Sequence, residues 1–117
     1  MIYLIEDDIS VVSAFELFLE SAEMEYKSFE SANIFLSQIN PDMNDLLVLD
    51  LNLPGMNGCE LLKTFIKGNI HIPVIVVTSF DEPYSRECCR QYGVKAYLRK
   101  PVDGEALIDL IKFHLHL

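Results

Sequence analysis

A single carboxylate, Asp50, ends the apolar run of the stretch LLVLDLNLPGMNG. Residues 46–49 lack helical spacing, which is typical of a strand buried on both faces. Asn52, Pro54 and Gly55 follow and favour a loop. In parallel α/β sheets, ligands bind at the carboxyl ends of the strands. A carboxylate there can attack a phosphoryl group or hold a metal ion, although a turn or helix-capping aspartate is the alternative for an isolated residue.

Other predicted strands also end on side chains that can do chemistry. Glu6 and Asp7 follow the first strand, Thr78 ends the fourth, and Lys100 follows the fifth. Because the carboxyl ends of parallel strands lie along one edge of the sheet, we expect these groups to gather near Asp50. Carboxylates ~4 Å apart repel each other by about 4 kcal/mol at an effective dielectric constant of ~20. Such crowding raises at least one pKa or recruits a cation.

The gathered oxygen atoms predict a divalent metal site. Without a His or Cys nearby, oxygen ligands favour Mg²⁺ or Mn²⁺ over zinc. Glu6, Asp7 and Asp50 are the predicted side-chain ligands, and the main-chain carbonyl of Asn52 and water complete the octahedron.

The same groups suit phosphoryl transfer. Asp50, ionised at neutral pH, is the predicted nucleophile, and the metal ion neutralises phosphoryl oxygens on one side. Lys100 supplies positive charge on the other side, and the Thr78 hydroxyl donates to a third oxygen. Taken singly, each is more often a surface acid, a solvated lysine or a strand-ending threonine. Their joint occurrence at successive strand ends favours the functional interpretation.

Hydrophobic periodicity predicts five strands that alternate with five helices. The strands are expected at Ile2–Ile5, Tyr26–Phe29, Leu46–Asp50, Val74–Thr78 and Ala96–Arg99. The helices are expected at residues 9–22, 31–39, 59–67 and 84–92, with a last helix that Asp103 caps. This alternation indicates right-handed crossovers and a parallel sheet with helices on both faces. The predicted fold is therefore a flavodoxin-like, doubly wound α/β fold with strand order 2-1-3-4-5.

Two features of the helices carry sharper expectations. In the third helix, Leu61, Leu62, Phe65 and Ile66 are predicted to face inward, since their spacing is helical. Gly93 is expected to end the fourth helix in a left-handed conformation.

Length and charge set the broad class. At 117 residues the chain is expected to form one domain, residues 1–117. A net charge of −9 argues against direct binding of nucleic acid or of an anionic membrane. The acids at residues 6–8 argue against a signal peptide, and no apolar run approaches the roughly 20 residues that span a bilayer. A cytoplasmic location is predicted.

The three cysteines, Cys59, Cys88 and Cys89, show no ligand or redox spacing. Their number is odd and two of them are adjacent. We therefore expect reduced thiols that act as small hydrophobic side chains in a cytoplasmic protein.

The order and spacing of the motifs resemble the receiver domain of two-component response regulators over essentially the whole chain. LIEDD follows the first strand, LDLNLPGMNG surrounds Asp50, VVTS ends the fourth strand, and YLRKP covers the fifth. The tail KPVDGEALIDLI is similar to members that regulate transcription. The resemblance also implies a cis peptide between Lys100 and Pro101.

The resemblance implies a role for each matching residue. The implied phosphoacceptor is Asp50, and the implied phosphate contacts are Lys100 and Thr78. The implied metal ligands are Glu6, Asp7, Asp50 and the main-chain carbonyl of Asn52. The implied switch residues are Thr78 and Tyr97. Glu6 stands where Asp is also common in the family, and its extra methylene suggests a water-mediated metal contact. Ser79 leaves room for phosphate, and the bulky Phe80 is expected to shield the acyl phosphate from water.

The implied partners are a sensor histidine kinase or phosphotransfer protein, with no enzymatic activity beyond self-phosphorylation and autodephosphorylation. Phosphorylation is expected to draw Thr78 inward, so that the Tyr97 ring fills the vacated space. This change repacks the face formed by the fourth helix, fifth strand and fifth helix, and controls an output such as transcription. A homodimer through the same face is a further expectation for the phosphorylated form.

Two alternatives belong to other classes. A small hydrolase or phosphotransferase with an aspartyl-phosphate intermediate needs a second acid two residues after the nucleophile, and that position is Asn52. A degenerate receiver that only binds a partner would have lost Asp50, Lys100 or one of the acidic pair, and all are present.

Overall fold

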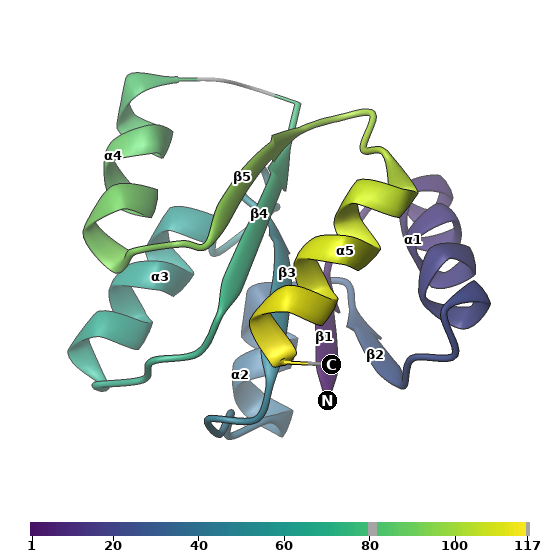
Figure 1. Ribbon diagram of the computed structural model, residues 1–117. Helices are drawn as coiled ribbons and strands as arrows, with labels where there is room; N and C mark the ends of the chain where they lie inside the picture. The colour runs from purple at the N-terminus through teal and green to yellow at the C-terminus, as the bar shows by residue number, and fades with distance from the viewer. Residues whose placement is uncertain (80–81, 117) are drawn as a thin grey trace.

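Five parallel strands form one sheet in the order β2-β1-β3-β4-β5 (Figure 1). The computed structural model describes residues 1–79 and 82–116. The strands are β1 (Ile2–Ile5), β2 (Tyr26–Phe29), β3 (Leu46–Asp50), β4 (Val74–Thr78) and β5 (Ala96–Arg99). All four neighbouring pairs run parallel. The predicted fold class, strand bounds and strand order are confirmed.

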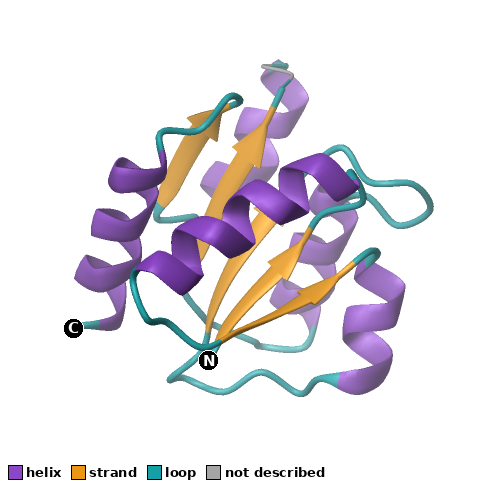
Figure 2. Cartoon of the chain, turned by 90° about the vertical axis from the view of Figure 1, so that its right-hand side faces the viewer, coloured by secondary structure: helices purple, strands orange, loops and turns teal. Residues whose placement is uncertain are grey.

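Helices cover both faces of this sheet (Figure 1, Figure 2). They are α1 (Ile9–Ser21), α2 (Ala32–Gln38), α3 (Gly58–Lys67), α4 (Pro83–Tyr92) and α5 (Gly104–Leu115). Helices α1 and α5 lie on one face, and α2, α3 and α4 lie on the other. In α1 and α2 the predicted ends are a residue too long because caps were counted as helix, whereas α3 and α4 each begin one residue before the predicted start. Ser31, for example, is the N-cap of α2 and accepts the Ile34 N–H at 3.1 Å.

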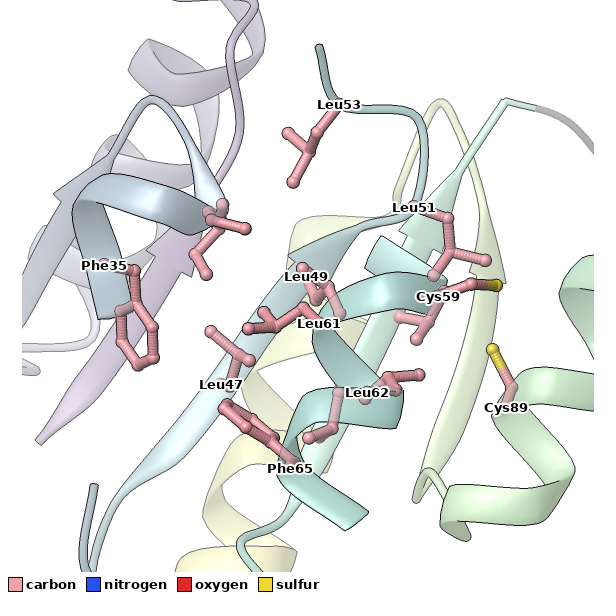
Figure 3. Packing of buried hydrophobic residues seen from close by; sticks show 14 of the residues in the cluster. Phe35, Leu47, Leu49, Leu51, Leu53, Cys59, Leu61, Leu62, Phe65 and Cys89 are labelled. Atoms are coloured by element: carbon pink, nitrogen blue, oxygen red, sulfur yellow. The ribbon is translucent and has the colours of Figure 1, made fainter. Parts of the chain in front are cut away.

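The core is built around β3 and β4, two strands in which every residue is buried. On the α2–α3–α4 face, Leu47 and Leu49 pack with Phe35 and Phe65 (Figure 3). Full burial of one such side chain contributes about 1.5–3 kcal/mol to folding. This packing holds the strand ends, and therefore the polar groups beyond them, in fixed positions.

Two expectations for helix residues have different outcomes. Helix α3 buries Leu61, Leu62 and Phe65, but Ile66 is 45% exposed, so its predicted inward position is wrong. The covered stripe of α3 stops at Phe65, and Ile66 lies one helical step beyond it. Gly93 ends α4 with φ of 83°, which confirms the predicted left-handed stop.

Gly58 fixes the loop that follows β3 against the first turn of α3. A Cβ atom at this position would lie 2.7 Å from the Leu51 Cα, closer than real side chains come. The Gly58 N–H donates to the Leu51 carbonyl at 3.0 Å, and Asn57 caps the helix by accepting the Glu60 N–H at 2.9 Å. The return of the chain behind Asp50 is therefore tight and well bonded.

The cysteines are not all reduced thiols, so that expectation is corrected. A disulfide joins Cys59 in α3 to Cys88 in α4, and Cys89 is free and buried. The two helices pack side by side on one face of the sheet (Figure 1), which brings the Cα atoms to 5.8 Å, inside the range that a disulfide spans. The residues are 29 positions apart, so only the helix packing pairs them.

Candidate functional site

Three carboxylates converge where β1 and β3 end. Glu6 and Asp7 follow β1, and Asp50 is the last residue of β3, its neighbour in the sheet. Each offers an oxygen, and these oxygens all lie within 4.8 Å of one another. Asp7 is exposed, whereas Glu6 and Asp50 are buried. The structure thus brings together the predicted acidic cluster at the carboxyl edge of the sheet.

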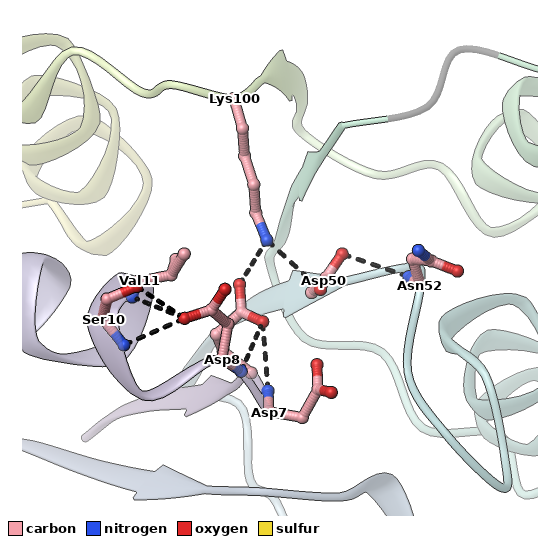
Figure 4. A network of polar contacts seen from close by, with 8 residues as sticks. Asp7, Asp8, Ser10, Val11, Asp50, Asn52 and Lys100 are labelled. Atoms are coloured by element: carbon pink, nitrogen blue, oxygen red, sulfur yellow. Dashed lines mark hydrogen bonds and ion pairs between the residues drawn. The ribbon is translucent and has the colours of Figure 1, made fainter.

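Asp50 is held from two sides (Figure 4). Asp50 is only 3% exposed. One oxygen, Oδ1, accepts the Asn52 N–H at 3.1 Å, and the other, Oδ2, lies 3.3 Å from the Lys100 Nζ. Sequence reasoning placed Asn52 here through its carbonyl and missed this N–H contact, which a short turn after a strand-ending aspartate commonly makes.

Glu6 is the buried carboxylate of the cluster that has a raised pKa. Its Oε2 accepts the N–H groups of Asp7 at 3.0 Å and Asp8 at 3.2 Å, and its Oε1 forms an ion pair with Lys100. Burial raises the pKa of Glu6 to about 7, and the charge of Asp50 adds to this while Lys100 opposes it. The predicted consequence of crowded carboxylates, a raised pKa, is therefore found at Glu6. The N–H contact of Asp8 was not expected.

Lys100 reaches back over the edge of the sheet from the end of β5 (Figure 4). Its main-chain N–H donates to the Thr78 carbonyl at 2.9 Å, and the following bond to Pro101 is cis, as predicted. Burial by itself lowers the pKa of Lys100, but the contacts with Glu6 and Asp50 outweigh it and raise the pKa. Lys100 is therefore fully protonated at neutral pH.

Thr78 and Tyr97 lie on the neighbouring strands β4 and β5. Thr78 is buried at the end of β4, one residue after Val77, the partner of Asp50 in the sheet. Tyr97 is half-buried, and the Arg86 guanidinium of α4 lies 5.1 Å from its ring centre. Phe80, expected to shield the site, lies outside the described residues.

A small cavity of about 150 Å³ borders the site. Asn52 and Thr78 line it from the sheet edge, Cys59 lines it from α3, and Tyr84 lines it from α4. A second hollow, of about 510 Å³, is lined by Glu6 and Asp7 on the other side of the acidic cluster. A hollow of about 840 Å³ lies at the opposite end of the sheet, and none of the three converging carboxylates is among its described lining residues. The candidate site therefore borders the two smaller hollows and not the large one.

The donor set fits a hard divalent cation. The cluster offers oxygen atoms from three carboxylates, and Lys100 pairs with two of them. Oxygen ligands with excess negative charge suit Mg²⁺ or Mn²⁺. Asp7 has room for water beside it, because it is exposed.

Solved structures of receiver proteins share this fold. The chain superposes on the response regulator StyR with a TM-score of 0.88 and 32% identity, covering 98% of this chain and 58% of that one. For a CheY-like receiver domain protein from Methanospirillum hungatei the TM-score is 0.87 at 29% identity, covering 98% and 92%. The fold and its carboxylate edge thus define the CheY-like class.

The sequence places the chain in a particular family of that class. Residues 2–112 match the family model of the response regulator receiver domain, so the chain belongs to this family of signalling domains. It is 32% identical to the transcriptional regulatory protein FixJ of Azorhizobium caulinodans, covering 97% of this chain and 54% of FixJ. It is 31% identical to nodulation protein W of Bradyrhizobium diazoefficiens, covering 95% and 49%.

Other relatives are much longer than the matched region. The DNA-binding transcriptional regulator NtrC of Klebsiella pneumoniae is 30% identical over 109 residues, which are 93% of this chain and 23% of NtrC. The chain therefore spans from about a quarter to about half the length of these relatives. The similarity concerns their receiver part.

Proposed function

We propose that this chain is a phosphorylation-controlled switch of a two-component system, with residues 1–117 forming one receiver domain. The observation that carries the proposal is the buried Asp50 carboxylate, which lies beside Lys100 and within 4.8 Å of the oxygens of Glu6 and Asp7. This carboxylate is held in position and lies next to a fixed positive charge. Family membership supports the same assignment.

The proposed reaction is transfer of a phosphoryl group to Asp50. A carboxylate oxygen of Asp50 forms a bond to phosphorus, and the bond from phosphorus to the donor breaks with its electron pair left on the donor atom. The donor is a phosphohistidine of a sensor kinase or phosphotransfer protein, or a small acyl phosphate. Water later cleaves the acyl phosphate, which releases phosphate and restores the Asp50 carboxylate.

The remaining groups stabilise charge on the transferred phosphoryl group. Lys100 lies 3.3 Å from the Asp50 Oδ2 and supplies a positive charge there, and the Thr78 hydroxyl is proposed to donate to a phosphoryl oxygen. Glu6, Asp7, Asp50 and the carbonyl of Asn52 would hold Mg²⁺ or Mn²⁺. When bound, that ion supplies further positive charge to the phosphoryl oxygens.

The proposed output is a change in the face formed by α4, β5 and α5. Thr78 moves toward the phosphoryl group, and the half-buried Tyr97 ring turns into the space that Thr78 leaves. Arg86 of α4 lies over that ring at 5.1 Å, so a change at Tyr97 reaches α4 directly. A phosphorylation-dependent homodimer through this face, and control of transcription as in relatives named for it, extend the proposal.

The proposed location is the cytoplasm. Among the residues that the structure describes, none of the helices is long and apolar enough to cross a membrane. With a net charge of −9, the domain is not expected to bind nucleic acid or an anionic membrane directly.

The test is the intact mass of the protein after incubation with acetyl phosphate and Mg²⁺. We expect the wild type to gain one phosphoryl group, and the gain to disappear with a chelator or in Asp50→Asn. Asp42→Asn is the matched control, because Asp42 is an exposed acid in the turn before β3; it should gain mass as the wild type does.

The outcomes separate the competing functions. No gain under any condition would refute the phosphoacceptor and favour a receiver that only binds a partner. A gain that persists in Asp50→Asn would place the acceptor elsewhere. Continuous hydrolysis of an added phosphate monoester, which is not an acyl-phosphate donor, would favour a small phosphatase.

A further inference from the structure

The disulfide between Cys59 and Cys88 links the proposed phosphorylation site to the proposed output face. Cys59 is the second residue of α3, and Cys88 lies in the middle of α4. Helices α3 and α4 run side by side on the same face of the sheet (Figure 1). One covalent bond therefore ties a helix that begins behind Asp50 to a helix that is expected to move.

Helix α3 is the fixed partner in this link. Asn57 and Glu60 form a reciprocal capping box at its start, and Gly58 lies against the Leu51 backbone with no room for a Cβ atom. Its inner residues, such as Leu61 and Phe65, are completely buried. If α4 moved, α3 could move with it only by breaking these hydrogen bonds and this packing.

Helix α4 is held more lightly. Glu82 occupies its N-cap position, but the Glu82 side chain makes no capping hydrogen bond among the described residues. Its buried residues are Cys88 and Cys89, and a polar contact to α3 joins Tyr84 to the Lys63 ammonium at 2.7 Å on the protein surface. Tyr92 anchors the C-terminal end of α4, because its ring packs on Phe65 of α3 and its hydroxyl accepts the Ile72 N–H at 3.1 Å. The bond through Cys88 is thus a major restraint on the rest of the helix.

We propose that Cys59 and Cys88 form a redox modification site, at which the disulfide clamps α4 to α3 and reduction releases it. The structure shows the clamped form. The consequence for signalling rests on the proposed function: the oxidised protein accepts a phosphoryl group at Asp50 but responds weakly on the α4–β5–α5 face. Disulfides in the cytoplasm are usually transient or redox-sensing, which agrees with a regulatory bond.

The reducing partner is a low-molecular-weight thiol. Its thiolate attacks the sulfur of Cys59, which lines the cavity beside Asn52 and Thr78, and Cys88 leaves as a thiolate that takes up a proton. A second thiolate then attacks the mixed disulfide, which frees Cys59 and yields the disulfide of the reductant. Two electrons and two protons reach the protein, and oxidised glutathione reverses both steps.

The neighbourhood suits this exchange. The sulfur of Cys88 lies 3.1 Å from the Ser85 carbonyl, so the released thiol finds an acceptor in place. Cys89, the neighbour of Cys88 in the sequence and also on α4 (Figure 3), is a poor nucleophile, because burial raises the pKa of its thiol to about 11. Cys89 therefore serves as the matched control.

The first measurement counts free thiols by intact mass. The protein is unfolded in denaturant in the presence of N-ethylmaleimide, which labels each free thiol. Without reductant the wild type should carry one label, on Cys89, and after dithiothreitol it should carry three. Cys89→Ala should carry none and then two, whereas Cys59→Ser should carry labels on both remaining cysteines without reduction. Full labelling of the unreduced wild type, even after exposure to oxidised glutathione, would overturn the proposed site.

The second measurement is amide hydrogen exchange of α4 without any phosphodonor. Reduction should speed exchange in α4 on the order of tenfold while α1 and α5 stay unchanged. Cys59→Ser under oxidising conditions should match the reduced wild type, and Cys89→Ala should keep the redox response. Equal exchange of α4 in both redox forms of the wild type would overturn the clamp.

The third measurement separates this inference from the proposed function. Both redox forms are incubated with acetyl phosphate and Mg²⁺, and phosphate uptake and α4 exchange are followed together. We expect equal uptake, with a change in α4 exchange that is larger in the reduced form. Failure of uptake in both forms refutes the proposed function alone, since the exchange measurement without phosphodonor decides the redox site. Equal responses in both forms refute the regulatory consequence of the clamp.

Discussion

Both ends of the parallel sheet bury carboxylates close to an ammonium group. At the amino end, Asp45 precedes β3; its Oδ2 accepts the Asp42 N–H at 2.9 Å and its Oδ1 lies 3.3 Å from the Met1 amino group. At the carboxyl end, Glu6 and Asp50 share Lys100, and Asp7 adds another negative charge.

This difference indicates that the acid at the amino end of the sheet serves stability and that the acids at the carboxyl end do not. The amino end pairs one carboxylate with one ammonium and one N–H donor, which is what a buried structural acid requires. The carboxyl end gathers more negative charge than its lysine balances, and burial together with the nearby charge of Asp50 raises the pKa of Glu6. An arrangement that opposes folding in this way is expected where charge is needed for binding or chemistry.

Removal of the shared cation should have the largest effect. Lys100→Met keeps the side-chain stem but leaves Glu6 and Asp50 buried without their partner, so the free energy of unfolding in EDTA should fall by about 3 kcal/mol. Mg²⁺ should recover part of the loss, because it binds the folded cluster. Urea unfolding followed by circular dichroism measures both.

The matched control is Lys112→Met on the exposed end of α5. Its free energy of unfolding should stay within about 0.5 kcal/mol of the wild type. If Lys100→Met were as mild as this control, the carboxyl end would not depend on its cation and the contrast between the two ends would disappear.

The pH dependence of stability should expose Glu6 next. Its pKa is about 7 in the folded protein, against 4.5 for the free side chain, so the folded state binds the proton more tightly. The free energy of unfolding in EDTA should therefore fall as the pH rises from about 4.5 to about 7, by roughly 2 kcal/mol, and level off above. Unfolding at several pH values, compared with Glu6→Gln, isolates this contribution.

In Glu6→Gln the decline between these pH values should be absent, because the titrating group is gone. Addition of Mg²⁺ to the wild type should flatten the curve as well, since the cation favours the ionised carboxylates. A wild-type curve parallel to that of Glu6→Gln in EDTA would contradict the raised pKa of Glu6.

Asp50→Asn should stabilise the protein while it abolishes phosphate uptake. The amide oxygen can still accept the Asn52 N–H, and the loss of one charge relieves repulsion with Glu6. We expect a gain of about 1 kcal/mol in EDTA, where one pKa unit corresponds to about 1.4 kcal/mol. The stabilisation by Mg²⁺ should shrink in the same urea titrations. A loss of stability in EDTA would mean that Asp50 is a structural acid like Asp45.

Much of this contrast could be predicted from the sequence, because strand ends are local features. Apolar runs that stop at Asp50 and Thr78 fix the strand bounds, and the parallel order then places Glu6 beside Asp50. The main-chain contacts of Asn52 and Asp8 to the carboxylates were not predicted, since they depend on loop dihedral angles that the residue types leave open.

The pairing of Cys59 with Cys88 was missed for a different reason. It depends on how α4 is rotated and placed against α3, and residue spacing along the chain carries no record of that packing. Ile66 was misplaced likewise, because helical periodicity defines an apolar face but not how far a neighbouring helix covers it. The sequence thus predicts positions within an element better than contacts between elements.

The smallest effect is expected at the amino end. Asp45→Asn keeps an oxygen that can accept the Asp42 N–H but loses the charge beside the Met1 amino group, so the free energy of unfolding should fall by about 0.5–1 kcal/mol. Unlike the changes at Lys100, Glu6 and Asp50, this loss should be the same in EDTA and in Mg²⁺, and phosphate uptake should be unchanged. A loss at Asp45 that Mg²⁺ repaired would show that the two ends of the sheet share one electrostatic system, and the separation between a structural acid and a functional cluster would then fail.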